Sequence, residues 1–86
     1  MIMTRILYFA WVRDAIGVTE EAVEIAADVS SVAELAGFLS TRSDGHARAF
    51  SDLTRLRAAV DLSMVGFDSA ITGASEIAFF PPVTGG

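Results

Sequence analysis

The strongest local signal in the sequence is the stretch S-V-A-E-L-A-G-F-L-S-T, residues 31–41. Its first four residues fit a capping box, in which Ser31 accepts a hydrogen bond from the first helical turn and Glu34 reaches back to the N-cap backbone. Apolar residues then recur at helical spacing, at Val32, Leu35, Ala36 and Leu39. The pattern predicts an amphipathic helix over Val32–Thr41, with one face directed at a core.

Strand patterns precede this helix. Residues 4–9, T-R-I-L-Y-F, are rich in β-forming residues and apolar on both faces, which predicts a strand inside a sheet. Residues 20–26 alternate between acidic and apolar side chains, which predicts a second strand with one wet face. Between the two strands we expect a short helix over Ala10–Ile16, closed by Gly17.

The chain after the predicted helix is expected to consist mostly of strands and turns. Pro81 and Pro82 end the last strand, because neither can donate a hydrogen bond to a ladder. The expected elements are a short helix over His46–Leu53, a loop over Asp52–Arg55, a turn near Thr72-Gly73, and strands over Leu56–Val60, Met64–Phe67 and Glu76–Phe80.

This order of elements predicts an α+β fold in two layers, with the main helix across one face of a mixed sheet. We expect the first and last strands to be central and parallel, which is the ubiquitin-like β-grasp arrangement. The chain of 86 residues suits a single domain. We place that domain over residues 1–82, followed by a flexible tail over residues 83–86.

The composition excludes several kinds of chemistry. The chain has no cysteine and no lysine, which excludes thiol nucleophiles, thiolate metal sites and attachment through a side-chain amine. Its formal net charge is −5, and its six arginines are scattered among eleven acids, which argues against a nucleic-acid partner. The hydrophobic fraction of 52% fits an alanine-rich core and an apolar face covered by a partner equally well.

The longest apolar run does not predict a membrane segment. It extends from Ile6 to Val12, whereas a helix that crosses a bilayer needs about 20 residues. A secretory signal would have a small-residue cleavage site after this run, but Arg13-Asp14 stands there. We therefore expect a cytoplasmic protein with no membrane partner.

The sequence ends in Val83, Thr84, Gly85 and Gly86. Counted from Pro82, this tail spans roughly 17 Å when fully extended. Glycine has no Cβ, so a di-glycine end can enter a passage in which any side chain would clash. It also leaves the terminal carboxylate of Gly86 unhindered for chemical activation.

This ending, together with other parts of the chain, resembles a known family. The stretch E-I-A-F-F-P-P-V-T-G-G, residues 76–86, is similar to the end of the small, sulfur-carrying subunit of molybdopterin synthase. Residues 6–10 (I-L-Y-F-A), Val12-Arg13 with Gly17, and residues 58–60 (A-A-V) resemble it as well. The resemblance covers essentially the whole chain.

Two turns depart from the family pattern. The family commonly has an asparagine-containing turn after the A-A-V strand, where this chain has Asp61-Leu62. It often has an Asp-Gly-Asp-Glu turn before the last strand, where this chain has T-G-A-S-E, residues 72–76. Neither change touches the tail.

The resemblance implies that the chemistry takes place at Gly86. An E1-like activating enzyme would use ATP, with Mg²⁺, to convert its carboxylate to an acyl adenylate. A sulfur donor would then displace AMP and leave a thiocarboxylate, which delivers sulfur to cyclic pyranopterin monophosphate. Gly85, which has no side chain, would let the tail pass through a narrow passage in its partners. By this resemblance the chain is a carrier that binds no cofactor or metal of its own and is not catalytic alone.

The resemblance also implies a protein partner, the large catalytic subunit of molybdopterin synthase, in an assembly of two small and two large subunits. Phe79 and Phe80 must point to opposite faces of their strand, so we expect one in the core and the other in an exposed apolar patch. The residues expected to contact the partner are Phe79, Phe80, Pro81, Pro82, Val83 and Thr84.

Some polar residues have simpler interpretations. The single histidine, His46, follows Gly45 in an expected surface loop, and we interpret it as a solvated residue. We interpret Glu20, Glu21 and Glu24 as the wet face of a strand, with docking to a basic activating enzyme as the alternative.

Three rival functions remain open at the level of the sequence. Sulfur carriers for thiamine or tRNA thiolation also end in Gly-Gly and share the activation chemistry, but F-F-P-P before the tail argues against them. A ubiquitin-like protein modifier would attach Gly86 to lysines of target proteins. A plain interaction module would not need Gly86 at all.

Overall fold

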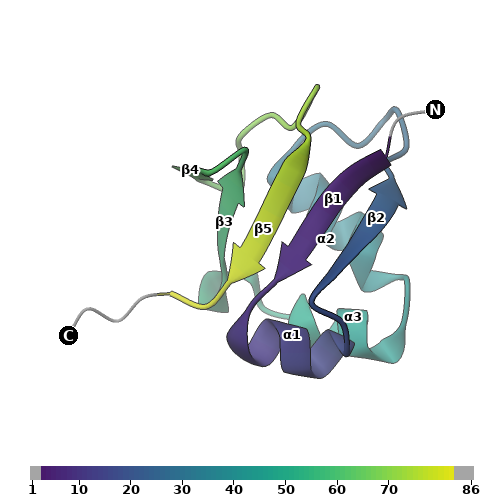
Figure 1. Ribbon diagram of the computed structural model, residues 1–86, viewed down its shortest axis with the longest axis vertical. Coiled ribbons are helices and arrows are strands. Elements are labelled where there is room, and N and C mark those ends of the chain that lie inside the picture. The colour runs from purple at the N-terminus through teal and green to yellow at the C-terminus, as the bar shows by residue number, and fades with distance from the viewer. Residues whose placement is uncertain (1–2, 83–86) are drawn as a thin grey trace.

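The structure, a computed structural model, describes residues 3–82. The β-strands form one sheet, and the helices cover a single face and one end of it (Figure 1). The elements in chain order are β1 (Met3–Tyr8), α1 (Ala10–Ile16), β2 (Glu20–Glu24), α2 (Val32–Ser40), α3 (Asp44–Ala49), a 3-10 helix (Leu53–Arg55), β3 (Arg57–Val60), β4 (Ser63–Val65) and β5 (Glu76–Phe80).

The sheet has five strands in the order β2-β1-β5-β3-β4. β1 and β5 run parallel, with Ile6 opposite Ile77, and the other three pairs of neighbouring strands are antiparallel. The first and last strands are thus parallel neighbours inside a mixed sheet, as the order of elements predicted. The α+β fold class is confirmed.

The predicted capping box is present at the start of α2. The Ser31 hydroxyl accepts a hydrogen bond from the backbone N–H of Glu34 (3.1 Å), and the Glu34 carboxylate accepts one from the backbone N–H of Ser31 (3.2 Å). Because the chain direction is fixed at this cap, the apolar side of the helix faces the sheet. The four residues named for that side are all buried: Val32, Leu35, Ala36 and Leu39.

The region between α2 and β3 differs from the expectation. α3 begins earlier than predicted, because the Ser43 hydroxyl caps it by accepting from the backbone N–H of His46 (3.1 Å). A 3-10 turn replaces the expected loop over Asp52–Arg55, since the Asp52 carboxylate accepts from the backbone N–H of Thr54 (3.1 Å). Short polar side chains that bond the backbone a few residues ahead set both boundaries.

The core lies between α2 and the inner face of the sheet. Alternate residues of the central strands are fully buried there, among them Ile6 and Tyr8 of β1 and Ile77 and Phe79 of β5. The same alternation turns the remaining residues of each strand to the opposite, outer face. No helix of the described part of the chain is long and apolar enough to cross a membrane.

Candidate functional site

The candidate site is the carboxyl end of β5, where the tail begins. β5 is the middle strand, so both of its edges are paired up to its end. On one side the backbone N–H of Phe9 donates to the Phe79 carbonyl (3.2 Å). On the other side Arg57 of β3 pairs with Phe80. The sheet therefore holds the start of the tail from both sides.

Phe79 and Phe80 point to opposite faces, as predicted. Phe79 is fully buried, and its ring packs edge-on against Phe50, with 4.9 Å between the ring centroids. Phe80 is half-buried on the outer face. The Phe79 side chain is enclosed by the core, so its surface is not available to a partner in this fold. Phe80 is the residue of the pair that a partner can reach.

The chain leaves the sheet at Pro81 and Pro82, both half-buried. Proline has no backbone N–H, so the ladder with β1 and β3 ends there. The expectations for Val83, Thr84, Gly85 and Gly86, namely the flexible tail, the partner contacts and the reactive carboxylate, lie outside the described residues.

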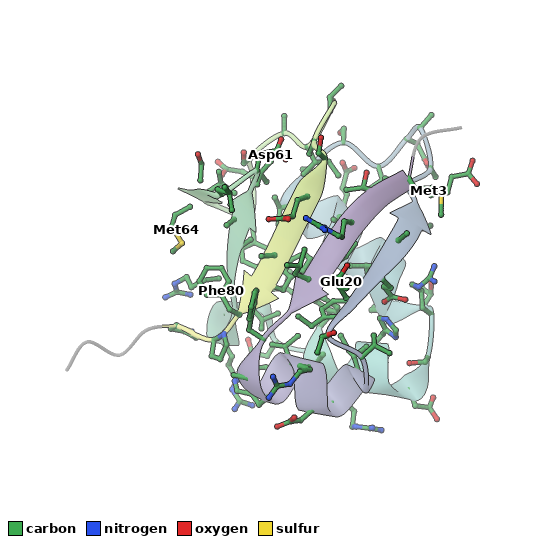
Figure 2. The ribbon with its side chains drawn as sticks, in the orientation of Figure 1. Met3, Glu20, Asp61, Met64 and Phe80 are labelled. Carbon is green, nitrogen blue, oxygen red and sulfur yellow. The ribbon has the colours of Figure 1, made fainter. Side chains whose placement is uncertain are left out.

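Apolar side chains gather on the outer face next to the tail. The strand register places Ala78 beside Leu7 of β1 and Ala59 of β3, and Ala59 beside Met64 of β4. Met64 is 66% exposed, and Figure 2 shows it on the same side of the molecule as Phe80. We call this set the outer-face patch: Leu7, Phe9, Ala59, Met64, Ala78 and Phe80.

Charged residues border the outer-face patch at the amino end of β5. The Arg5 guanidinium lies 2.6 Å from the Glu76 carboxylate and 4.0 Å from that of Glu20. These ion pairs cross from β1 to both neighbouring strands. An apolar area with a polar rim is the usual organisation of a protein–protein interface.

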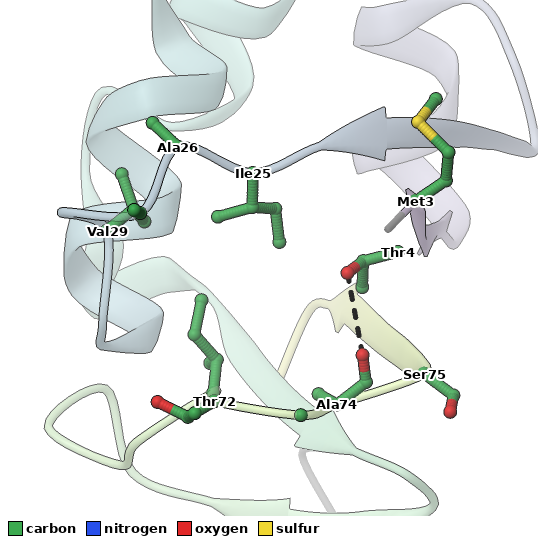
Figure 3. A pocket seen from close by; sticks show the side chains of 11 residues that line it. Met3, Thr4, Ile25, Ala26, Val29, Thr72, Ala74 and Ser75 are labelled. Atoms are coloured by element: carbon green, nitrogen blue, oxygen red, sulfur yellow. Dashed lines mark hydrogen bonds between the residues drawn. The ribbon is translucent and has the colours of Figure 1, made fainter. Parts of the chain in front are cut away.

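A groove at the other end of the sheet is separate from the tail. Its volume is about 470 Å³, and it is lined by the first residues of β1, the loop after β2 and the loop before β5, including Met3, Ile25, Val29 and Thr72 (Figure 3). These segments lie at the amino ends of β1 and β5, whereas the tail starts at the carboxyl end of β5. The groove is not part of the candidate site.

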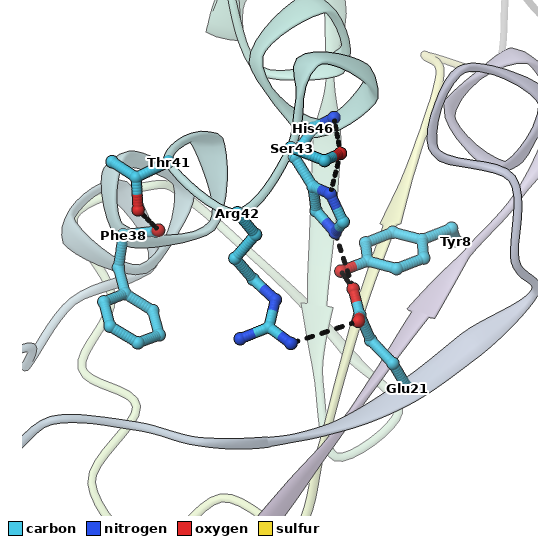
Figure 4. Close-up of polar contacts among 7 residues, drawn as sticks. All are labelled: Tyr8, Glu21, Phe38, Thr41, Arg42, Ser43 and His46. Carbon is cyan, nitrogen blue, oxygen red and sulfur yellow. Dashed lines mark hydrogen bonds and ion pairs between the residues drawn. The ribbon is translucent and has the colours of Figure 1, made fainter.

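A hydrogen-bonded cluster corrects two interpretations of polar residues (Figure 4). His46 is not a solvated loop residue: it lies in α3, is 7% exposed, and its Nε2 lies 2.6 Å from the Glu21 carboxylate. Its Nδ1 lies 2.7 Å from the Ser43 hydroxyl. Glu21 is likewise not on the wet face, because it shares the inner side of β2 with Val23 and also accepts from the Tyr8 hydroxyl (2.6 Å).

The surroundings of Glu21 favour its charged form. Partial burial raises the pKa of Glu21, but hydrogen bonds from Tyr8 and His46 and the nearby charge of Arg42 outweigh it, so its pKa lies below the ordinary value. Burial, followed by the hydrogen bond to Glu21, raises the pKa of Tyr8. Because Glu21 and His46 are far apart in the sequence, no local pattern indicated this contact.

Within residues 3–82, no three side chains of the usual metal-binding types come together. The cluster around Glu21 lies on the helix side of the sheet, away from the outer-face patch. It joins β1, β2 and α3 to one another and belongs to the scaffold.

The fold, in which β1 and β5 are parallel neighbours inside a mixed sheet, defines the class of protein, a ubiquitin-like β-grasp protein. Among solved structures, a Pyrococcus furiosus protein described as molybdopterin converting factor subunit 1 superposes with a TM-score of 0.66 at 20% identity, covering 96% of this chain and 100% of that chain. Small archaeal modifier protein 1 of Haloferax volcanii superposes with a TM-score of 0.63 at 18% identity, covering 96% and 100%. At such identities these likenesses concern the fold alone.

Sequence comparison identifies the family. The molybdopterin synthase sulfur carrier subunit of Escherichia coli strain K12 is 44% identical over 84 residues, which cover 98% of this chain and 100% of that protein. The protein of the same description from Haemophilus influenzae is 34% identical over the same coverage. The ThiS family model matches residues 6–86. The chain belongs to the ThiS family.

Proposed function

We propose that this chain is a sulfur carrier in molybdenum cofactor biosynthesis, with the Gly86 carboxylate as its reactive group. One observation carries the proposal: the 44% identity to a protein described as a molybdopterin synthase sulfur carrier subunit extends over 100% of that protein. The family match also continues through Gly85 to Gly86. The similarity to the small subunit therefore extends over nearly the whole chain, including its last residues.

The placement of β5 supports a role for the tail. The strand is paired on both edges and anchored by the buried ring of Phe79. A tail that starts from such a fixed point presents its end within a limited volume. Holding a reacting group in position lowers the entropic cost of its reaction in a partner's site.

The proposed reaction begins with activation by an E1-like enzyme. A carboxylate oxygen of Gly86 attacks the α-phosphate of ATP, with Mg²⁺ bound to the nucleotide, and pyrophosphate leaves. The product is an acyl adenylate, in which AMP is a good leaving group. Sulfide-level sulfur, supplied by a sulfur donor as hydrosulfide, then attacks the acyl carbon, AMP departs, and the tail ends in a thiocarboxylate.

The second stage takes place in the large catalytic subunit of molybdopterin synthase. The thiocarboxylate sulfur is ionised at neutral pH and displaces an oxygen from a carbon of cyclic pyranopterin monophosphate, so that a C–S bond forms as a C–O bond breaks. Water then cleaves the bond between the sulfur and the Gly86 carbonyl carbon, which restores the carboxylate. A dithiolene contains two sulfurs, so two loaded tails are consumed for each molybdopterin, which suits an assembly of two small and two large subunits.

The outer-face patch is the proposed docking surface for the large subunit. It lies on the face that none of the helices within residues 3–82 covers (Figure 1), and it includes Phe80 and Phe9 near the carboxyl end of β5. A partner that takes up the tail must approach this end of the sheet. Burial of the patch would also account for the high hydrophobic content of the chain.

The test is sulfur loading of the purified chain with ATP, an E1-like activating enzyme and a sulfur source. The intact mass should rise by the difference between one sulfur and one oxygen, and fragmentation should place the gain on Gly86. Adding the large subunit and the pterin precursor should then yield molybdopterin and the original mass. A mass gain on another residue, or loading without transfer to the pterin, would contradict the proposal.

A further inference from the structure

The turn between β3 and β4 has an unusual backbone. Its two residues, Asp61 and Leu62, have φ angles of 47° and 73°. Both lie in the left-handed region, as in the type I′ turns that join two hairpin strands. Glycine, asparagine and aspartate tolerate this region, whereas a bulky side chain in it is a conformational outlier. Leucine at position 62 is therefore a conformational outlier.

Asp61 has a structural reason for its conformation. Its carboxylate accepts hydrogen bonds from the backbone N–H groups of Ser75 and Glu76, each at 3.0 Å. Its own N–H donates to the Glu76 carbonyl (2.9 Å). These three bonds fasten the turn to the beginning of β5, and they stabilise the fold.

For Leu62, the monomer shows no comparable feature that explains the left-handed backbone conformation. Its side chain is 88% exposed, so burial in the core contributes little. Its backbone conformation is one that glycine would adopt without cost. Unfavourable backbone conformations that persist in a protein are concentrated where they serve binding or another function.

The position of Leu62 connects it to the outer face. It lines an open hollow of about 400 Å³ together with Arg5, Asp61, Ser75 and Glu76. Met64, two residues further along the hairpin, is a member of the outer-face patch and is 66% exposed. Figure 2 shows Asp61 and Met64 on this hairpin, with Phe80 near the start of the tail. Leu62 thus lies beyond Met64 on the same hairpin, at the charged rim of the outer-face patch.

We infer that Leu62 is a docking residue for the large catalytic subunit, which covers the exposed Leu62 side chain. The inference rests on the proposed function and extends the proposed interface from the tail to the opposite end of β5. The five residues of β5 correspond to about 17 Å of strand. An interface of standard size, about 800 Å² on each partner, spans that length.

The tail limits where the partner lies. Four residues follow Pro82, which reach at most about 14 Å. The large subunit must therefore lie against the end of the sheet that carries Phe80. If the large subunit also covers Met64, it lies along the β3–β4 edge of the sheet. Leu62 is the next exposed apolar side chain on that edge.

Two substitutions separate the backbone effect of Leu62 from its contact with the partner. Leu62→Gly removes the side chain and relieves the backbone, so its Tm should rise by about 3 °C. Leu62→Ala removes most of the side chain but keeps the unfavourable conformation, so its Tm should stay within about 1 °C of the parent. Calorimetric titration with the large subunit should give a Kd about tenfold weaker for both variants.

Phe80→Asp is the control for the rest of the interface. It should weaken binding whether or not Leu62 contacts the large subunit. If Phe80→Asp loses binding while both Leu62 variants bind like the parent, the inference about Leu62 is wrong and the proposed function stands. If the parent chain itself does not bind the large subunit, the proposed function fails and the inference falls with it. A gain in Tm for Leu62→Gly combined with weaker binding is the result that supports the inference.

Discussion

Gly45 lies on α3 where this helix meets the last turn of α1. A Cβ atom built on Gly45 would lie 3.2 Å from Ile16 Cα and would contact the backbone carbonyl oxygen of Ala15 more closely still. These are backbone atoms, which cannot rotate away as the end of a side chain can. The contact between the two helices therefore requires glycine at this position.

Gly45→Ala should lower the free energy of unfolding by about 1–3 kcal/mol, because the added methyl group forces α1 and α3 apart. The matched control is Gly37→Ala on α2, where an added Cβ meets no atom within 4 Å. There the exposed helical position should gain up to about 1 kcal/mol from the better helix propensity of alanine. Urea denaturation of the two variants checks both values, and equal effects would contradict the packing argument.

At the scale of residues, the sequence was informative where partners are close along the chain. Ser31 and Glu34 lie three positions apart, and their capping box is present as predicted. His46 was interpreted wrongly, because its partner Glu21 lies 25 positions away and only the fold brings the two together. Similarly, nothing local distinguished the buried Phe79 from the half-buried Phe80 before the register of β5 was known.

At the scale of elements, the Glu21 cluster joins three segments that are separate in the sequence. Glu21 comes from β2, Tyr8 from β1 and His46 from α3. The carboxylate of Glu21 accepts hydrogen bonds from the Tyr8 hydroxyl and faces the His46 ring at 2.6 Å. Glu21 thus helps to fasten the edge strand β2 to the helix layer, together with the buried Val23.

The cluster predicts how stability depends on pH. The pKa of Glu21 is lowered in the folded protein relative to 4.5, so its charged form stabilises the fold above pH 4.5, and this contribution is lost as the pH falls through the lowered pKa. Glu21→Gln should therefore be less stable than the parent at neutral pH, by about 1.5 kcal/mol. The difference should shrink in acid.

Chemical denaturation of the parent and Glu21→Gln across the acidic range measures this difference directly. Glu24→Gln is a suitable control, since Glu24 lies on the same strand and is exposed. Its curve should follow that of the parent. A difference between parent and Glu21→Gln that grows as the pH falls would contradict the assignment.

The elements themselves were largely predictable from periodicity. The run of β-forming residues over 4–9 and the helical spacing after Ser31 predicted β1 and α2 to within one residue. The boundaries of α3 and the 3-10 turn were missed, because Ser43 and Asp52 set them through hydrogen bonds to the backbone. For the site, β5 and the prolines after it were predicted, whereas the positive φ of Leu62 was not visible in the sequence.

At the scale of the whole molecule, the proposed function depends on how far the tail reaches and on how little space it occupies. Deletion of Gly86 shortens the tail by about 3.5 Å. A misplacement of the reacting group by about 1 Å can already cost about 100-fold in rate. Replacing Gly85 by valine keeps the length but adds a branched side chain.

Both tail variants should lose sulfur transfer to the pterin precursor while their melting temperatures stay at the parental value, because neither change touches the core within residues 3–82. The decisive measurement uses the Gly85→Val chain prepared chemically as a thiocarboxylate, which bypasses the activating enzyme. This preloaded variant should remain inactive with the large subunit. Conversion at a near-parental rate would show that the passage in the synthase does not require glycine at position 85.

The central position of β5 also has a consequence for the order of events during translation. β5 is the last of the described strands to leave the ribosome, yet β1 and β3 have no common neighbour until it arrives. Strand pairing across such long sequence separations is slow compared with local folding. The nascent chain therefore closes its sheet only when residues 76–80 have emerged, and Gly86 follows only six positions later. Under the proposed function, an activating enzyme would therefore meet Gly86 only on a chain whose five described strands are already complete.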